Sequence, residues 1–362
     1  RRAAALASAP PAHFARELRR RLREPMRPIL RGALRAVLSA TTVGPARLGG
    51  VPPWRVGRRR VALTLLYGRP WSRLFGRMVQ HLQRLDFAWP LLTVSIGQAA
   101  WGACRAAAAT AAAGSSRASS RARYPPAVAC WRPASASQVH RFTIIHILLH
   151  LGVDVFYFDM DVFFLRSPLP PVLARTSAGA GAEVVFSSHG DSDCVNIGVF
   201  LILATRATAA WFSQFLAWYH DHQYEIDQRG LDVLLGSPRR VLSPPERLLP
   251  QRPPKLEVSY LPTDLVQVRA TVLDDWTEFA IGPLIGWSGK VSGLVAFHWC
   301  NHPFEQKWEE LAAAYSAAEA LAGRLPLSLA LAVAAPALEE QAEPGQGDAD
   351  DAWAALRRAR GV

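Results

Sequence analysis

Short apolar runs alternate with longer amphipathic segments through the middle of the chain. Val61–Tyr67 is almost wholly apolar and is followed by Gly68, and Pro90–Ser95 is a second such run. Runs of this length beside Gly or Pro are typical of buried strands. The segment between them, residues 71–85, has the pattern of a helix. Strand, helix and strand in this order predict a parallel α/β sheet.

The same pattern continues downstream. A helix is predicted over residues 138–151, where Gly152 ends it, and the next residues, Val153–Phe158, give the strongest strand prediction in the chain. Further strands are expected at Glu183–Ser187, Ile197–Leu203 and Leu294–Phe297, and further helices over 206–220, capped by Thr205, and around Leu231–Leu235. Residues 105–123, rich in Ala, Ser, Gly and Arg, look like a flexible insertion. The expected fold class is α/β, with a mainly parallel central sheet flanked by helices.

The pattern divides the chain into three parts. Residues 1–58 are rich in Arg, Ala and Pro and have no sustained apolar period, which is typical of a stem or a disordered tail. Residues 59–318 hold the predicted elements and are expected to be the folded domain. Residues 319–362, rich in Ala and Glu, are expected to be a second tail.

The positive charge belongs to the first part. The net charge of the chain is +12, but residues 1–60 alone hold fifteen arginines against two acids. The other 26 basic and 27 acidic residues nearly cancel, so the expected domain is almost neutral. The basic segment lacks the interleaved aromatic residues and the folded module of a nucleic-acid-binding region, and no nucleic-acid partner is expected.

The cysteines and the apolar segments set further limits. Cys104, Cys130, Cys194 and Cys300 are widely spaced, and without a C-x-x-C pair a zinc or thioredoxin-like site is not expected. One or two disulfides and four buried free thiols both fit this spacing. No run of about twenty apolar residues occurs, so no transmembrane helix is predicted within this sequence.

Two acids follow the strand Val153–Phe158 directly. Asp159 and Asp161 stand between strongly apolar runs, at the strand end where parallel sheets place ligands. On an extended backbone, side chains two residues apart point the same way, so both carboxylates can face one site. Close carboxylates repel each other unless a cation lies between them or one takes up a proton. A divalent cation that bridges to a diphosphate would neutralise the acids and stabilise charge on a departing nucleoside diphosphate.

Two other interpretations of the acidic pair stay open. A surface loop could carry two solvated acids, although the apolar runs on both sides argue against it. Phosphatases of the haloacid dehalogenase type also have two acids at this spacing after an apolar strand, and Asp159 would then be a nucleophile. Their motif usually opens the domain and continues with Thr or Val where this chain has Phe163.

The stretch Leu149–Pro168, which reads LHLGVDVFYFDMDVFFLRSP, resembles the nucleotide-diphospho-sugar transferases of glycosyltransferase family 77. Plant cell-wall xylosyl- and arabinosyltransferases are members of that family. Three downstream segments resemble further family motifs in the same order: Asn196-Ile-Gly198, Asp227-Gln228, and His298 with Lys307. The resemblance covers about residues 60–315.

This resemblance implies a GT-A type fold and a role for each matching residue. Asp159, Asp161 and His298 would bind a metal, and Mn²⁺ is expected because the ligands mix oxygen with imidazole. Lys307 and Arg166, with Asp159, would contact the donor, and Asp227 and Asn196 would be the catalytic residues. Structural alternatives stay open: a core histidine at 298, a solvated lysine at 307, a turn residue at 196, a helix cap at 227, and pairing of Arg166 with Asp161. Trp299 is a candidate platform for a sugar ring.

These residues together predict a metal-dependent glycosyltransferase. It would move a hexosyl or pentosyl group from a nucleoside diphosphate, expected to be UDP, to a hydroxyl of a glycan or glycoprotein. The resemblance alone implies retention of the anomeric configuration and a place in the Golgi lumen, with a membrane anchor expected upstream of Arg1. The alternative from another class is a nucleotide-sugar-binding protein without transferase activity.

Overall fold

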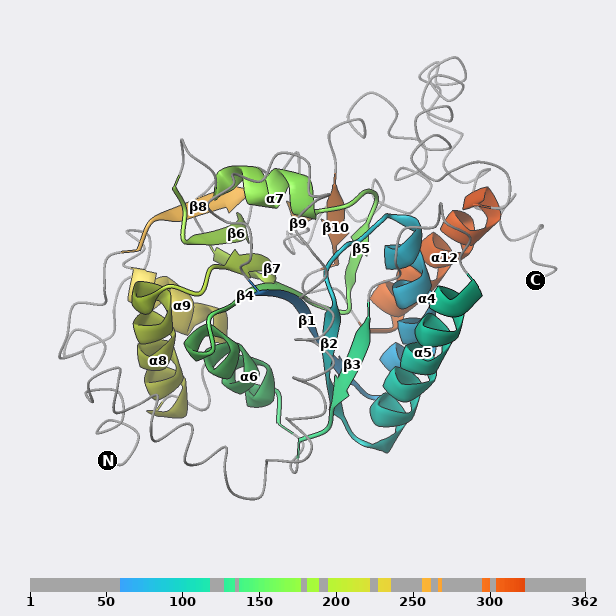
Figure 1. Ribbon diagram of the computed structural model, residues 1–362, viewed down its shortest axis with the longest axis horizontal. Coiled ribbons are helices and arrows are strands. Elements are labelled where there is room, and N and C mark those ends of the chain that lie inside the picture. Colours follow the sequence, from blue (N-terminus) through green and yellow to red (C-terminus); the bar gives the residue numbers. More distant parts are fainter. Residues whose placement is uncertain are drawn as a thin grey trace, which may run out of the picture.

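The computed structural model describes residues 59–117, 127–133, 137–176, 181–188, 195–221, 227–235, 256–261, 266–268, 295–299 and 304–322. The stem expected over residues 1–58 and the tail beyond residue 322 lie outside this part of the chain. The described residues form a large central sheet with helices on both faces and a small second sheet (Figure 1).

The central sheet has seven strands in the order β3-β2-β1-β4-β7-β6-β8. They are β1 (Arg59–Tyr67), β2 (Leu91–Ile96), β3 (Val128–Trp131), β4 (Val153–Phe158), β6 (Val184–Ser188), β7 (Val195–Ile202) and β8 (Val258–Leu261). Strands β3, β2, β1 and β4 are parallel neighbours, and β8 is parallel to β6. Strand β7 runs antiparallel to both β4 and β6. The mainly parallel sheet expected from the sequence is confirmed.

Helices cover both faces of the sheet (Figure 1). One face packs against α4 (Arg69–Arg84), α5 (Gln98–Arg117) and α12 (Phe304–Ala322). The other packs against α6 (Val139–His150), α8 (Arg206–Asp221) and α9 (Asp227–Leu235). A short helix, α7 (Leu169–Arg175), follows β5. The α/β class with flanking helices, as expected for a GT-A type fold, is therefore confirmed.

Strand β1 shows why its sequence from Val61 onward is apolar at nearly every position. Val61, Leu63 and Leu65 pack against the face covered by α6 and α8, whereas Ala62 and Leu66 pack against the face covered by α4 and α5. Side chains of a strand alternate between the two faces, so a strand covered on both sides needs apolar residues at nearly every position.

A small sheet of three strands lies next to the central one. β5 (Val162–Phe164) pairs antiparallel with β10 (Ala296–His298), and β9 (Val266–Val268) pairs parallel with β10. The register places His298 opposite Val162. It therefore brings the end of a distant strand next to Asp161, the residue before β5.

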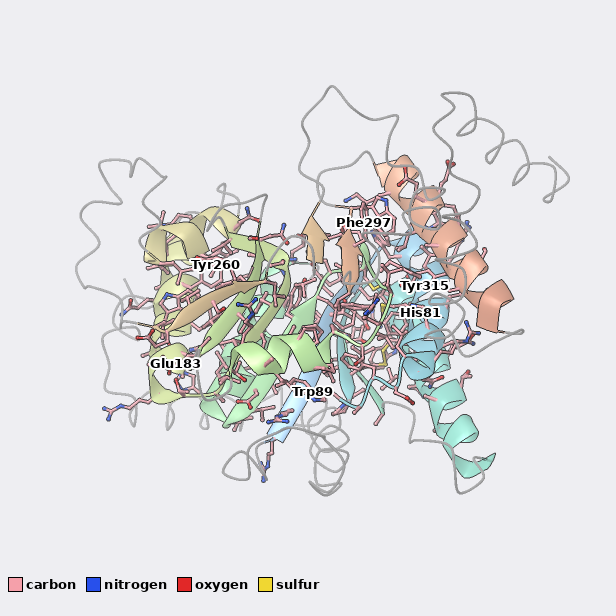
Figure 2. All side chains as sticks on the ribbon, turned by 90° about the horizontal axis from the view of Figure 1, so that it is seen from above. His81, Trp89, Glu183, Tyr260, Phe297 and Tyr315 are labelled. Atoms are coloured by element: carbon pink, nitrogen blue, oxygen red, sulfur yellow. A yellow bond between two sulfur atoms is a disulfide. The ribbon has the colours of Figure 1, made fainter. Side chains whose placement is uncertain are left out.

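The interior beside the small sheet contains a buried histidine. Figure 2 shows His81 of α4 beside Tyr315 of α12. The His81 ring stacks on Phe163 of β5 at 4.6 Å between centroids, and its Nε2–H donates to the Phe164 carbonyl oxygen at 2.6 Å. This one side chain therefore links α4, β5 and α12 in the core.

Two expected boundaries differ from the structure. Of the flexible insertion expected over residues 105–123, residues 105–117 belong instead to helix α5, and residues 118–123 lie outside the described part of the chain. Ala is the best helix former, and Ala100, Cys104 and Ala107 put a buried face at helical spacing against the sheet. Helix α12 includes Glu319 and ends at Ala322, so the boundary expected at residue 318 falls inside a helix.

A disulfide joins α5 to the edge strand β3. Cys104 and Cys130 are bonded, with their Cα atoms 6.0 Å apart. Of the two alternatives left by the spacing, this pair is the disulfide; Cys194 and Cys300 lie outside the described residues. Among the helices that the structure describes, none combines the length and the apolar character that a membrane span needs.

Candidate active site

The acidic pair lies in the tight connection between β4 and β5. The Asp159 backbone N–H donates to the Gly198 carbonyl at 2.8 Å, and the Val162 N–H donates to the Asp159 carbonyl at 3.3 Å. The Asp161 carbonyl accepts the Trp299 N–H at 3.1 Å. The two acids thus stand in a turn rather than on the extended backbone expected, and backbone hydrogen bonds to β7 and to the end of β10 fix that turn.

The turn brings both carboxylates to His298. Ligand atoms of Asp159, Asp161 and His298 all lie within 4.8 Å of one another. His298 Nε2 is 3.3 Å from Asp161 Oδ1, and Lys307 Nζ of α12 is 2.7 Å from Asp161 Oδ2. The structure therefore brings together four residues that the sequence analysis placed in one site.

Arg141 is a member of this site that the sequence analysis missed. Its Nη1 lies 3.3 Å from Asp159 Oδ1 and donates to the Tyr157 hydroxyl at 3.0 Å. The Tyr157 hydroxyl in turn donates to the same Asp159 oxygen. A signal was available, because an arginine inside the apolar helix 138–151 must find a partner when it is buried.

The two carboxyl groups differ in acidity. Burial raises the pKa of Asp159, and the neighbouring Asp161 adds to this against the opposing charge of Arg141. Burial would also raise the pKa of Asp161, but His298 and Lys307 outweigh it and hold that pKa well below its usual range. Asp161 is therefore ionised. The ionised form of Asp159 is the one that a nearby cation would stabilise most.

Asn196 fixes the orientation of the His298 ring. Its Oδ1 accepts the Gly198 N–H at 2.9 Å and the Ser187 hydroxyl at 3.0 Å, and it lies 3.1 Å from His298 Nδ1. A backbone N–H can only donate, so the amide oxygen must be the atom at this junction. His298 Nδ1 then carries a proton, and Nε2 is the atom turned to the carboxylates.

Gly198 makes room for that ring. A Cβ at position 198 would lie 2.0 Å from His298 Cε1 and 2.5 Å from Nδ1. The residues of the Asn-x-Gly segment thus act on His298 in two ways, by hydrogen bonding and by lacking a side chain. The family resemblance implies a catalytic role for Asn196 and gives no sign of its contact with His298.

The remaining candidate residues make no described side-chain contact with the acidic pair. Asp227 is the first residue of α9, but its side chain lies outside the described part. Arg166 is exposed, and its backbone N–H donates to Val295. Trp299 is fully buried and donates from its indole nitrogen to Glu310, so it is a core residue and not a sugar platform.

Tyr67 is a second residue that the sequence analysis missed. It is the last residue of β1, which is the parallel neighbour of β4. Among the described residues, it is the one large hydrophobic side chain that is exposed. Partial burial raises the pKa of its hydroxyl, and the charges of Asp161 and Asp159 raise it further. The Tyr67 side chain is therefore close enough to interact electrostatically with the acidic pair, and it remains accessible to solvent.

The donor set at the acidic pair suits a divalent cation. Two carboxylates and one imidazole nitrogen converge, and His298 presents Nε2 because Asn196 holds Nδ1. Such mixed oxygen and nitrogen sets suit first-row divalent metals. A cation there would neutralise the acids and act as a Lewis acid toward a phosphate oxygen.

Several solved structures and one family model resemble this chain. A search among curated proteins found no match. Solved structures with a similar shape include the glycosyltransferase GlyE of Streptococcus pneumoniae TIGR4, at 14% identity and a TM-score of 0.41, covering 76% of this chain and 64% of that one. The chain therefore spans just under two thirds of the length of GlyE.

Two further structures match nearly over their own full length. The galactosyltransferase LgtC, solved with donor and acceptor sugar analogs, is 15% identical with a TM-score of 0.38, covering 70% of this chain and 95% of that one. Mouse xyloside xylosyltransferase 1 is 12% identical with a TM-score of 0.42, covering 68% and 99%. TM-scores below 0.5 support no assignment by themselves.

The family match is more specific because it contains the site. The model of a family described as nucleotide-diphospho-sugar transferase matches residues 134–283. This span is less than half of the chain, but it holds Arg141, the acidic pair and the Asn-x-Gly segment. The resemblance to the nucleotide-diphospho-sugar transferases that the sequence motifs suggested is thereby confirmed for the region that builds the acidic pair.

Proposed function

We propose that this protein is a metal-dependent glycosyltransferase that takes a sugar from a nucleoside diphosphate, UDP, and places it on a hydroxyl of a glycan or glycoprotein. The observation that carries the proposal is the convergence of Asp159, Asp161 and His298 at the carboxyl end of β4. This is the edge of a parallel sheet where α/β proteins bind ligands. It also lies mostly within the region that matches the family.

Each residue of the site has a proposed task. Asp159, Asp161 and His298 hold the cation, for which Mn²⁺ is the proposed ion because oxygen and imidazole ligands meet. Lys307, now paired with Asp161, supplies positive charge to the diphosphate as the bond to the sugar breaks. Arg166 as a donor contact and Asp227 and Asn196 as catalytic residues stay predictions from the family resemblance. The same holds for retention of configuration and for the class of sugar.

We further propose that the protein works in the Golgi lumen. The family resemblance suggests this place, and the Cys104–Cys130 disulfide supports a compartment where disulfides persist. Imaging of the tagged full-length protein beside Golgi and cytosolic markers tests this directly. A cytosolic pattern, with Cys104 and Cys130 open to alkylation in cells, contradicts it.

The function is tested by UDP release. The purified chain is incubated with a panel of UDP-sugars and Mn²⁺, and free UDP is measured with and without chelator. We expect metal-dependent release with at least one sugar, and loss of that release in Asp161→Asn but not in the control Glu309→Gln, an exposed acid of α12. Donor binding without release would indicate a binding protein. Turnover of p-nitrophenyl phosphate that disappears in Asp159→Asn would indicate a phosphatase.

A further inference from the structure

Two histidines and a serine meet between helices α6 and α8, away from the acidic pair. His146 Nε2 lies 3.1 Å from His150 Nε2 and 2.8 Å from Ser213 Oγ, and His150 Nε2 lies 3.4 Å from the same oxygen. The histidines are one helical turn apart on α6, so their rings share a face. His146 is buried, and His150 is partly exposed.

The three atoms have the spacing of metal ligands. Two ligands of a tetrahedral ion with metal–ligand bonds of about 2.0–2.1 Å are about 3.3 Å apart. The three separations of 2.8, 3.1 and 3.4 Å lie around this value. One ion could therefore touch both nitrogens and the serine oxygen after shifts of a few tenths of an ångström.

Proton counting shows why a cation fits this junction. The Ser213 hydroxyl donates to the Ala209 carbonyl at 2.8 Å, so it has no hydrogen left for a histidine. In the tautomer in which His146 Nε2 carries the hydrogen, that hydrogen serves both Ser213 Oγ and the lone pair of His150 Nε2. A metal ion in place of this shared hydrogen would bind all three atoms, and the displaced proton would be released to the solvent.

The surroundings of the two rings disfavour their charged forms. Burial, and after it the neighbouring His150, lowers the pKa of His146 to about 3. Burial also lowers the pKa of His150.

We propose that His146, His150 and Ser213 form a second metal site, which takes Zn²⁺, Ni²⁺ or Cu²⁺ and ties α6 to α8. Imidazole favours these ions, whereas Mg²⁺ and Mn²⁺ favour oxygen ligands. The acidic site offers two carboxylates and one imidazole, whereas this site offers two imidazoles and a hydroxyl. This proposal does not depend on the transferase activity, because the acidic pair takes no part in it.

The experiment uses the full chain in an Asp161→Asn background, which weakens the acidic site. The thermal unfolding midpoint and the binding isotherm are measured with Zn²⁺, with Mg²⁺ as the comparison ion. We expect Zn²⁺ to raise the midpoint reversibly and Mg²⁺ to have no such effect. Adding His150→Gln should weaken Zn²⁺ binding at least about tenfold, because loss of a direct ligand costs no less than loss of a supporting contact.

Two further variants keep the test decisive. Ser213→Ala removes the oxygen and should weaken Zn²⁺ binding while leaving both nitrogens. His140→Gln, a substitution on the same helix, should leave it unchanged. Histidines outside the described residues are present in every variant, so their contribution cancels. Equal Zn²⁺ affinity and equal midpoint shifts with and without His150 would overturn the proposal, and Ser213→Ala settles the question if His150→Gln does not fold.

Discussion

Asn196 Oδ1 lies 3.1 Å from His298 Nδ1 and joins two segments that are a hundred residues apart in the sequence. The same oxygen accepts the Gly198 N–H, which fixes the amide and with it the histidine ring. Residues that hold a metal ligand by its second nitrogen set its orientation and strengthen its binding. The Asn-x-Gly segment is therefore part of the proposed metal site even though it contributes no ligand itself.

A substitution at Gly198 should disturb the metal site without direct contact to an ion. In Gly198→Ala the new Cβ would lie 2.0 Å from the His298 ring, so the ring has to move. We expect Mn²⁺ affinity, measured by calorimetry, to fall about 10–100-fold. Gly102→Ala in α5 is the matched control, because a Cβ there meets no atom within 4 Å. Unchanged Mn²⁺ affinity in Gly198→Ala would show that His298 is not a ligand.

Removing one acid should separate donor binding from folding. Asp161→Asn takes away the carboxylate that pairs with Lys307 and faces His298. UDP affinity in the presence of Mn²⁺, measured by calorimetry, should drop at least about tenfold, because a metal ligand is lost. UDP binding without metal should be less affected. If Asp161→Asn binds UDP with Mn²⁺ as the unchanged protein does, the metal assignment is wrong.

The disulfide should contribute measurably to stability. Cys104 and Cys130 are 26 residues apart in the sequence, and closing a loop of this size stabilises a fold by about 3.5 kcal/mol in the chain-entropy model. The Cys104→Ala, Cys130→Ala double variant should therefore unfold at a lower denaturant concentration by a corresponding amount. A reducing agent should lower the midpoint of the unchanged protein and leave that of the variant in place. Equal midpoints for both proteins would contradict this.

The sequence predicted strand β4 and the acids after it because both depend on local pattern. Val153–Phe158 is apolar at nearly every position, as a strand covered on both faces must be, and the acids interrupt that pattern at once. The end of strand β10 at His298 could be predicted for the same reason. What local pattern could not give is the pairing of His298 with Val162, because a register between distant strands is set by tertiary packing.

The structure differs from the sequence-based expectation at two further places, the Ala-rich segment and Arg141, and the physical causes are different. The low complexity of the Ala-rich segment after Cys104 suggests an insertion, yet Ala favours helix, and the buried face of this segment packs on the sheet. The apolar face of helix α6 predicts its packing on the sheet but says nothing about the partner of Arg141. Its partner, Asp159, lies on another element, so the pairing that permits an arginine to be buried cannot be seen from the helix alone.

The buried His81 should make stability depend on pH below neutrality. Burial lowers its pKa from 6.5 to about 4, and its Nε2–H remains bonded to the Phe164 carbonyl. Between these two pH values the unfolded chain binds a proton that the folded protein does not. Stability therefore falls as pH decreases from about 6.5 to about 4, by about 3 kcal/mol for this residue at full effect.

Replacing His81 by Gln tests this dependence. The glutamine amide keeps a donor for the Phe164 carbonyl but does not titrate. We expect His81→Gln to be less stable at pH 7, because the ring contacts with Phe163 and Tyr315 are lost. Its urea unfolding free energy should nevertheless decline less between pH 6.5 and 4.5 than that of the unchanged protein. His146 is present in both proteins, so its contribution to the pH dependence cancels in the comparison. Parallel pH profiles of the two proteins would mean that His81 takes up its proton as readily in the folded protein as in the unfolded chain.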